Sequence, residues 1–299
     1  MFWSTSAGSQ RNNMIITRLT GGLGNQLFQY TAGRSLSNHL NVPLKLDVRY
    51  YENYGHRRYL LDKFKISAEI ATLKEIHLLK SESLFGAILS KVLGVKNEHV
   101  FKQPNYNFYP HFLNLSDNTY LDGDGSWQNE KYFKNIEYII RSELILKEPI
   151  TKSADLLMED IKNTNSVGIH IRRSDYFAIK NQKIFSICDK EYYQNAISII
   201  KERTSNPKLF VFSDDIKFAH TLPFPEDTVY VEKGFGLEDY EELIIMSKCK
   251  HNITANSTFS WWSAWLNTNP NKLIITPKKW FIDETRYNDD LIPKDWIQL

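Results

Sequence analysis

The sequence has few cysteines, no long hydrophobic run and almost no net charge. Cys188 and Cys249 are the only cysteines among 299 residues, too few for a disulfide framework or a zinc cluster, and they suit small buried side chains in a reducing, cytoplasmic protein. No stretch approaches the roughly 18 consecutive apolar residues that cross a bilayer. Lysine and arginine total 37 against 35 aspartate and glutamate, an excess too small to indicate nucleic acid as a partner. We therefore expect a soluble globular protein without a transmembrane segment.

Motifs for covalent catalysis and for metal binding are missing as well. The chain has no Gly-x-Ser-x-Gly turn and no cysteine in a nucleophile setting, so we expect a substrate to supply the nucleophile. The nearest approach to a metal-binding pair of carboxylates is Asp122-Gly123-Asp124. We expect no bound metal and no other cofactor, with this pair as the alternative metal site.

Strand-like and helix-like segments alternate along the rest of the chain. The strand-like runs cover 14–19, 42–46, 167–171, 208–212, 229–231, 252–254 and 272–276. This order predicts an α/β fold with parallel sheets covered on both faces. A break near residues 145–155 predicts two Rossmann-like domains, an N-terminal domain over 14–150 and a C-terminal domain over 151–299. Residues 1–13 are polar and precede Met14, which indicates a disordered leader or an alternative start.

The densest cluster of charge lies where the run 167–171 should leave its sheet. Four ionisable side chains fall within six residues there: His170, Arg172, Arg173 and Asp175. In open α/β sheets ligands bind at such carboxyl ends, and the planar fork of arginine matches phosphate oxygens. The arginine pair therefore suggests a nucleotide-activated substrate. The alternative is that both arginines form ion pairs with some of the acidic residues.

A glycine-rich turn follows the first strand-like run. Residues 20–26 are Thr-Gly-Gly-Leu-Gly-Asn-Gln, and a helical pattern follows over 27–40. Three glycines in four residues let the backbone turn tightly and approach a ligand, while the helix start offers unpaired N–H groups to an anion. The spacing matches neither a dinucleotide-binding fingerprint nor a P-loop.

The run 208–212 ends in Ser213-Asp214-Asp215. A carboxylate at this strand end is placed to accept hydrogen bonds from the base or ribose of a nucleotide. The alternative is an N-cap for a helix that begins near residue 216. The two aspartates need not share one role.

The segment 256–265 holds three of the seven tryptophans within five residues. Its first residues, Asn256, Ser257 and Thr258, place hydroxyls and free backbone N–H groups at a strand-to-helix junction, which suits a phosphate. Trp261 and Trp265 are four residues apart and share a helix face, so core packing is their default role.

Together these segments resemble glycosyltransferase family 11, the bacterial-type α-1,2-fucosyltransferases. The resemblance is carried by residues 21–30, 170–176, 212–215 and 256–262, in this order, and runs from residue 14 almost to the C-terminus. One departure is Ser174, where the family usually has glycine. It bears only on the local loop geometry, because serine tolerates a positive φ poorly.

The resemblance implies a glycosyltransferase B fold, with the nucleotide in the C-terminal half and the acceptor entering from the N-terminal half. It also implies GDP-β-L-fucose as the donor and an inverting transfer to the 2-hydroxyl of a terminal β-galactose. Bacterial members act on lipid-linked O-antigen or related glycans in the cytoplasm, so peripheral contact with the inner face of the membrane is expected. Several β-galactosides present the same 2-hydroxyl, so the acceptor stays open, as does the oligomeric state.

Carried over to this chain, the resemblance assigns a set of donor-binding residues. They are Gly22, Gly24, Asn25 and Gln26 in a loop facing the cleft, His170 at the nucleoside, Arg172 and Arg173 at the diphosphate, Asp214 at the guanosine, and Ser257 and Thr258 at the phosphates. Arg172 is further expected to act in catalysis on the departing β-phosphate, and Asn25 on the fucose or the diphosphate.

Inversion requires a carboxylate, or a relay, within hydrogen-bond reach of the attacking hydroxyl. Asp175 is the candidate base. Its alternative role is an ion pair that fixes Arg172 or Arg173, and Asp124 or Glu130 is placed to approach the acceptor from the opposite half instead. A highly dissociative transition state would need little assistance from any base.

Two other functions are alternatives. One is a transferase of related fold with another donor sugar or linkage; the other is a non-catalytic nucleotide- or glycan-binding module in which arginines bind an anion and tryptophans stack on sugar. Motifs in both halves of the chain argue against the module. The aromatic tail around Trp280, Phe281 and Trp296 is expected to cross back onto the N-terminal half or to form a contact surface.

Overall fold

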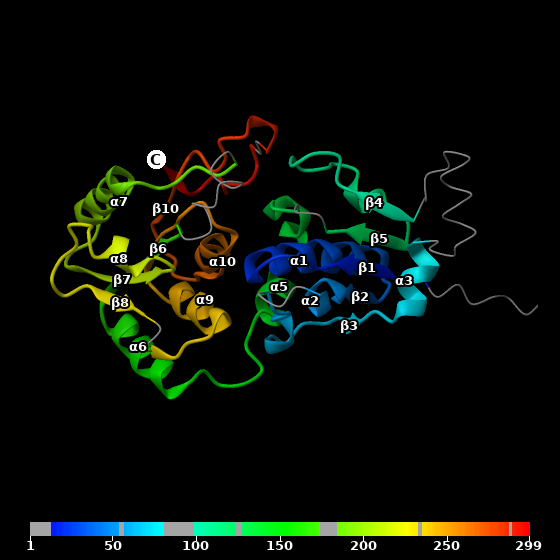
Figure 1. Ribbon diagram of the computed structural model, residues 1–299, viewed down its shortest axis with the longest axis horizontal. Helices are drawn as coiled ribbons and strands as arrows, with labels where there is room; N and C mark the ends of the chain where they lie inside the picture. The colour runs from blue at the N-terminus through cyan, green and yellow to red at the C-terminus, as the bar shows by residue number, and fades with distance from the viewer. Residues whose placement is uncertain are drawn as a thin grey trace, which may run out of the picture.

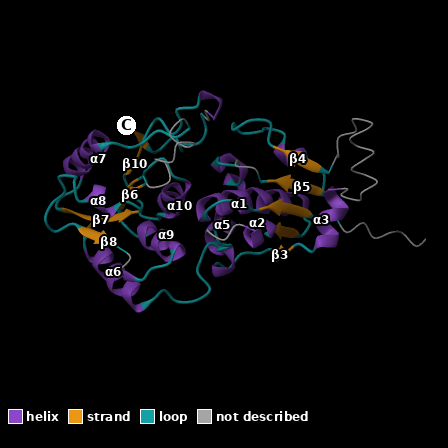
Figure 2. Cartoon of the chain, viewed as in Figure 1, coloured by secondary structure: helices purple, strands orange, loops and turns teal. Residues whose placement is uncertain are grey.

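The computed structural model describes residues 13–53, 57–80, 99–123, 127–173, 184–232, 235–286 and 289–299. Two lobes are visible, one from each half of the chain, and they meet through helix α1 (Leu23–Leu40) and helix α10 (Thr258–Leu266) (Figure 1). Each lobe has one sheet with helices packed around it (Figure 2). The predicted α/β fold with two Rossmann-like halves is therefore confirmed.

Five parallel strands form the sheet of the N-terminal half, in the order β3-β2-β1-β5-β4. Their bounds are Ile15–Arg18 for β1, Leu44–Asp47 for β2, Glu69–Ile70 for β3, Val100–Lys102 for β4 and Thr119–Asp122 for β5. Ile15 packs in the core that contains α1, and Ile16 packs on the other face against α3 (Leu73–Lys80). This alternation places the glycine-rich turn directly after the central, doubly covered strand.

Six parallel strands form the sheet of the C-terminal half, in the order β11-β10-β9-β6-β7-β8. Their bounds are Asn165–Ile171 for β6, Pro207–Ser213 for β7, Val229–Val231 for β8, His251–Ile253 for β9, Ile274–Thr276 for β10 and Ile297–Gln298 for β11. The chain builds outward from β6 in one direction and from β9 in the other. The crevice between the carboxyl ends of β6 and β9 is therefore the expected ligand site.

The remaining α-helices among the described residues cover the sheets and connect their strands. They are α2 (Arg49–Asn53), α5 (Glu137–Glu143), α6 (Lys152–Asn163), α7 (Lys190–Arg203), α8 (Ile216–Ala219) and α9 (Asp239–Ser247). The last helix of the N-terminal half ends at Glu143, just before the predicted break near residues 145–155, and the next helix begins at Lys152, within it. The exact domain boundary at residue 150 stays a prediction.

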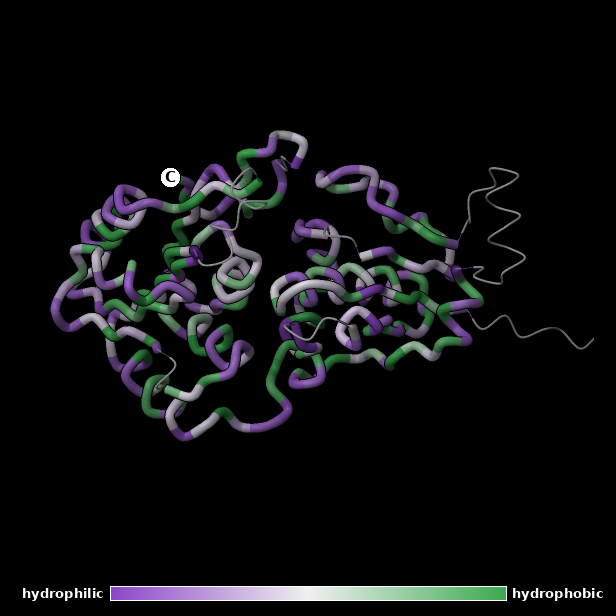
Figure 3. The backbone as a smooth tube through the Cα atoms, viewed as in Figure 1, coloured by the Kyte–Doolittle hydropathy of each residue, from purple (hydrophilic) through white to green (hydrophobic). Residues whose placement is uncertain are grey.

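Tryptophans of α10 hold the two halves together. The ring of Phe28 lies 4.6 Å from that of Trp261 and 5.0 Å from that of Trp262, and Phe133 stacks on Trp262 at 5.3 Å. Core packing is thus confirmed as the role of the tryptophans, and the core is shared between the halves. The facing parts of α1 and α10 are nevertheless pale in Figure 3, because glycine, serine, threonine and tryptophan have hydropathies near zero.

Several predicted elements differ from the structure in their extent. Helix α1 begins at Leu23, four residues before the predicted start, so most of the glycine-rich segment is helical rather than a turn. The edge strands β3, β4 and β11 have two or three residues each and were not predicted. Cys188 and Cys249 are buried, as expected. In the part of the chain that the structure describes, no helix combines the length and apolarity needed to span a bilayer.

Candidate active site

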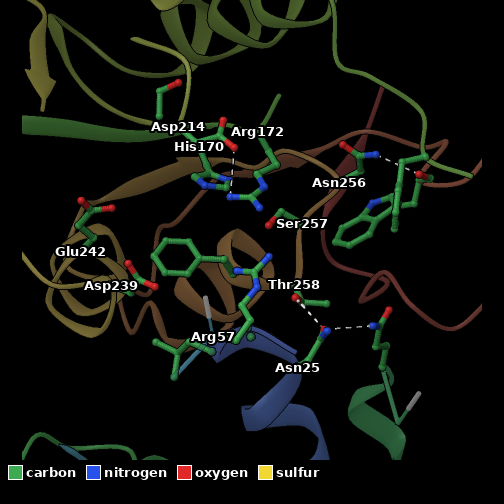
Figure 4. A pocket seen from close by; sticks show the side chains of 18 of the residues that line it. Asn25, Arg57, His170, Arg172, Asp214, Asp239, Glu242, Asn256, Ser257 and Thr258 are labelled. Atoms are coloured by element: carbon green, nitrogen blue, oxygen red, sulfur yellow. Dashed lines mark hydrogen bonds and ion pairs between the residues drawn. The ribbon is translucent and has the colours of Figure 1, made fainter. Parts of the chain in front are cut away.

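A cavity of about 540 Å³ lies between the two halves, at the carboxyl ends of strands from both sheets. The N-terminal half contributes the loop after β1, together with Arg57, Tyr106 and Gln128. The C-terminal half contributes the ends of β6, β7 and β8 and the starts of α9 and α10 (Figure 4). The predicted residues that line this cavity are Gly22, Gly24, Asn25, His170, Arg172, Asp214, Ser257 and Thr258.

Arg172 follows β6 and lies in the cavity with its side chain 25% exposed. Its Nη1 is 3.1 Å from Oδ2 of Asp214, and the other carboxylate oxygen accepts the backbone N–H of Arg173 at 2.8 Å. Asp214 therefore holds Arg172 in place from the neighbouring strand end. The predicted ion-pair alternative is correct for this arginine, but the pair itself faces the cavity.

Arg173 does not line the cavity. Its guanidinium lies 3.6 Å from the ring centroid of Phe218, and its Nε is 3.3 Å from the carboxylate of Asp215. Asp215 also accepts the backbone N–H of Phe218 at 3.1 Å and caps α8, which confirms the N-cap alternative for this aspartate. The adjacent arginines thus separate into one cavity residue and one residue that fastens α8.

His170 is buried at the end of β6, 5.3 Å from the ring of Phe259 at the start of α10. Burial, with a smaller contribution from the charge of Arg172, lowers the pKa of its imidazole to about 3. The ring is therefore neutral near pH 7. Its Nδ1 has no hydrogen-bond partner among the described residues, so a ligand in the cavity has a buried polar atom to satisfy.

The first turn of α1, which follows the loop after β1, lies against the start of α10. Gly21 has a φ of 77°, which favours glycine, and a Cβ on Gly24 would lie 2.5 Å from the backbone carbon of Thr258. Oδ1 of Asn25 accepts the Thr258 hydroxyl at 3.1 Å and faces the amide of Gln128 at 3.4 Å. These contacts bring the two predicted anion-binding segments to one wall of the cavity.

Ser257 precedes α10 and makes no side-chain capping hydrogen bond. Its side chain lines the cavity together with that of Thr258. The N–H groups of the first helical turn have no carbonyl partner within the helix. The structure therefore places a positive helix end beside Arg172, as expected for an anion site.

Gln26 is buried and does not line the cavity. Its side-chain amide donates to the backbone oxygen of Arg58 at 2.8 Å and accepts the N–H of Leu60 at 2.9 Å. It therefore holds the loop that carries Arg57, whose guanidinium points into the cavity (Figure 4). Arg57 was not predicted as a site residue, although the Arg57-Arg58 pair repeats the doubled arginine seen after β6.

Two acidic residues of α9, Asp239 and Glu242, also line the cavity and were not predicted. Burial raises the pKa of the Glu242 carboxyl to about 7, with a smaller contribution from the charge of Asp239. The only sign of this pair in the sequence is its spacing of three residues on a helix, which brings both side chains to one face.

Asp175, Ser174 and Asp124 fall outside the described residues. Glu130 does not line the cavity; its carboxylate accepts the indole N–H of Trp265 at 3.2 Å.

The carboxylate of Asp122 forms ion pairs with Arg18 at 3.0 Å and Lys102 at 3.1 Å. Within the described ranges no group of three or more metal-binding side chains occurs.

The aromatic tail takes part in the site, which was not predicted. Trp280 and Phe281 line the cavity, while Trp296 packs 5.5 Å from Trp261. The tail also returns to the N-terminal half, where Asp290 forms a salt bridge with Lys131 at 2.5 Å.

Comparison with known proteins agrees with this arrangement. The model of the family described as Glycosyl transferase family 11 matches residues 7–299. The chain belongs to glycosyltransferase family 11. Because the match begins at residue 7, it includes part of the predicted leader; residues 1–12 lie outside the described residues.

Two Escherichia coli proteins are similar to this family 11 enzyme over nearly their whole length. An alpha-1,2-colitosyltransferase is 34% identical over 96% of this chain and 99% of its own. The O-antigen biosynthesis glycosyltransferase WbnK is 31% identical over 94% of this chain and 99% of its own. The protein is therefore a glycosyltransferase.

Among solved structures, the fucosyltransferase NodZ from Bradyrhizobium is similar, with a TM-score of 0.51 and 15% identity over 85% of this chain and 92% of NodZ. A structure of NodZ alpha-1,6-fucosyltransferase co-crystallised with GDP matches with a TM-score of 0.50 and 14% identity over the same shares of the two chains. These likenesses establish the glycosyltransferase B type of fold.

Proposed function

We propose that this family 11 glycosyltransferase transfers L-fucose from GDP-β-L-fucose to the 2-hydroxyl of a terminal β-galactose, with inversion at the anomeric carbon. One observation carries the proposal. Arg172 and the uncapped start of α10 meet at the switch point of the C-terminal sheet, next to Asn25 in the first turn of α1 from the other half. A nucleoside diphosphate fits between a cation and a helix N-terminus at such a crevice.

In the reaction, the galactose 2-oxygen forms a bond to the anomeric carbon while the bond from that carbon to the β-phosphate oxygen breaks. GDP leaves with the bonding electron pair, and the hydroxyl proton passes to a base. Arg172, oriented by Asp214, and the first turn of α10 stabilise the charge that develops on the diphosphate. Asn25 contacts the fucose or the diphosphate from beside Thr258, on the same wall as the start of α10, and Asp175 stays the predicted base.

The 34% identity to an alpha-1,2-colitosyltransferase supports GDP-colitose as an alternative donor. L-Colitose is L-fucose without its 3-hydroxyl, so the same diphosphate contacts serve either sugar. A site that hydrogen-bonds the 3-hydroxyl would reject colitose strongly, because its polar groups would lose their partner.

The acceptor we propose is a β-galactoside on a lipid-linked glycan at the cytoplasmic face of the membrane. The name of WbnK, an O-antigen biosynthesis glycosyltransferase, supports this class of acceptor. We propose no metal requirement, because the anion site already combines an arginine with a helix N-terminus.

The test is a donor comparison with purified protein and a lactose-type acceptor, in the presence of EDTA. We expect GDP release that depends on the acceptor and an α-1,2-fucosylated product from GDP-fucose, with slower turnover of GDP-colitose. Faster turnover of GDP-colitose would show that colitose, and not fucose, is the preferred donor sugar. Loss of activity in EDTA would overturn the proposed metal independence. Nucleotide binding without product from either donor would support the non-catalytic module.

A further inference from the structure

One end of the cavity is shaped differently from the region around Arg172 and α10. Its walls there are apolar side chains at the end of β8, before α9 and in the first turn of α10: Val231, Leu237 and Phe259. The neutral ring of His170 lies beside Phe259. A nucleobase is flat and largely apolar on its faces, so this end of the cavity suits the base when the diphosphate lies at Arg172.

The acidic side chains of α9 divide into those that hold the fold and those that face this end of the cavity. Glu241 accepts the backbone N–H groups of Thr151 at 2.8 Å and Glu238 at 3.0 Å. Glu238 forms an ion pair with Arg58 across the two halves. These two carboxylates are therefore structural.

Glu242 and Asp239 lie on the cavity side of α9 (Figure 4). The Glu242 side chain is half-buried, and its carboxylate has no hydrogen bond or ion pair within the part of the chain that the structure describes. Partial burial without a protein partner disfavours the ionised carboxylate, in agreement with its raised pKa. The fold keeps this group where a ligand, rather than the protein, can satisfy it.

Guanine is the base whose edge matches a carboxylate. Its N1–H and 2-amino groups are adjacent donors, and an ionised carboxylate offers two acceptor oxygens side by side. Adenine presents an acceptor at N1 and lacks the 2-amino group. Its N1 lone pair would therefore face a carboxylate oxygen and repel it. Hypoxanthine keeps the N1–H donor and lacks the 2-amino group, and therefore satisfies one of the two oxygens.

The resemblance to the family assigned the guanosine to Asp214, but both oxygens of that carboxylate already have partners. One is paired with Arg172 and the other accepts the backbone N–H of Arg173. Asp214 is therefore a positioning residue for the arginine in this structure. Glu242 is better placed than Asp214 to read the base.

We propose that the carboxylate of Glu242 accepts hydrogen bonds from N1–H and the 2-amino group of guanine and so selects guanine nucleotides. The proposal rests on the proposed function for the presence of a nucleotide in the cavity. It adds the residue that distinguishes the base, and it does not depend on the sugar, the linkage or the acceptor.

The experiment compares the affinities for GDP, IDP and ADP by titration calorimetry at pH 8, with wild type, Glu242→Gln and Asp239→Asn. We expect wild type to bind GDP at least about tenfold more tightly than IDP, because a hydrogen bond to a charged group is lost, and ADP more weakly still. Glu242→Gln should weaken GDP binding by at least about tenfold and bring the GDP and IDP affinities close together. Asp239→Asn, on the same helix face, should keep the wild-type ratio of GDP to IDP affinity.

Thermal unfolding of each variant shows whether it is folded, so that loss of binding in a misfolded protein is recognised. Glu242→Asp serves as a second variant that retains the charge and should recover part of the preference for GDP. An unchanged ratio of GDP to IDP affinity in folded Glu242→Gln would overturn the proposal. A wild type that binds GDP in preference to IDP but transfers no sugar would overturn the proposed function alone, whereas no binding of GDP would overturn both.

Discussion

The side-chain oxygen of Asn25 accepts a hydrogen bond from the hydroxyl of Thr258 at 3.1 Å, and this contact joins the two halves at the wall of the cavity. Asn25 belongs to the first turn of α1 and Thr258 to the first turn of α10. The helix starts that were predicted as separate anion-binding segments therefore form one unit. The position of the donor relative to the acceptor side depends on how closely these two helices approach.

Gly24 permits that close approach, and Gly24→Ala should disrupt it. The added Cβ would lie 2.5 Å from the carbonyl carbon of Thr258 and 2.6 Å from the backbone nitrogen of Phe259, so α10 must move. We expect a loss of about 1–3 kcal/mol in the free energy of unfolding, as for other overpacked interfaces, together with a severe loss of transfer activity. Urea unfolding and initial rates measure the two effects.

Gly22→Ala is the matched control for this variant. Its Cβ would meet a terminal nitrogen of Arg57 at 3.3 Å, which is the end of a flexible side chain. We expect little change in the free energy of unfolding. Equal destabilisation by both substitutions would show that the loop, and not the helix contact, is sensitive.

Alanine substitutions of the two adjacent arginines after β6 should have different effects, one on catalysis and the other on stability. Arg172→Ala should reduce kcat/KM by about 10²–10³-fold, because it removes a donor to the departing diphosphate, with little change in melting temperature. Arg173→Ala should lower the free energy of unfolding by about 1–2 kcal/mol, because it removes the contacts with Phe218 and Asp215. Paired measurements of kinetics and unfolding test this separation, and a catalytic defect of equal size in both variants at unchanged stability would contradict it.

The different fates of these arginines illustrate how far the sequence alone could predict the site. The cavity residues His170 and Arg172 were found because a hydrophobic strand ends beside them and parallel strands end at one edge of a sheet. Arg173 was wrongly assigned to the ligand together with Arg172. Successive side chains at a strand end point to opposite sides, so Arg173 turns away from the cavity and packs against α8. Arg57 and Glu242 were missed because their positions depend on packing between segments far apart in the sequence.

Gln26 should act through Arg57. Gln26→Leu leaves the backbone oxygen of Arg58 and the N–H of Leu60 without their buried partner, which costs about 1–3 kcal/mol in the free energy of unfolding. Because the Arg57 guanidinium points into the cavity, we expect Arg57→Ala to lower kcat/KM. The loop that carries Arg57 loses its support in Gln26→Leu, so this variant should lower kcat/KM to a similar extent. Combining both substitutions should add little further loss in kcat/KM, whereas fully additive losses would show that Gln26 does not position Arg57.

Asp175 stays the predicted base, and its substitution distinguishes proton transfer from an ion pair. Asp175→Asn should lower kcat by about 10²–10⁴-fold with little change in KM for the donor if it takes the proton. An effect on donor KM and GDP affinity instead would indicate that Asp175 holds an arginine. Steady-state kinetics with varied GDP-fucose and calorimetric GDP binding separate the two.

The carboxyl of Glu242 should connect stability and GDP binding to pH with opposite signs. Its pKa in the folded protein is raised from 4.5 to about 7 by burial and by Asp239, so the protonated form favours folding. That contribution is complete below about pH 4.5 and is lost as pH rises through about 7. Glu242→Gln, which stays neutral, should therefore have the higher melting temperature at pH 8, and the difference should shrink toward pH 5.

Binding of GDP requires the ionised carboxylate in our proposal, so wild-type affinity should fall by up to about tenfold per pH unit below 7. The other acidic, arginine and histidine side chains that line the cavity are Arg57, His170, Arg172, Asp214, Asp239 and Arg286. The imidazole, with its pKa near 3, stays neutral throughout this range. The terminal phosphate of GDP also titrates, with a second pKa of about 6, so Glu242→Gln is the reference that removes this contribution. Calorimetry from pH 6 to pH 8 should give a steeper pH dependence for wild type than for Glu242→Gln, and parallel curves would show that the carboxylate does not meet the base.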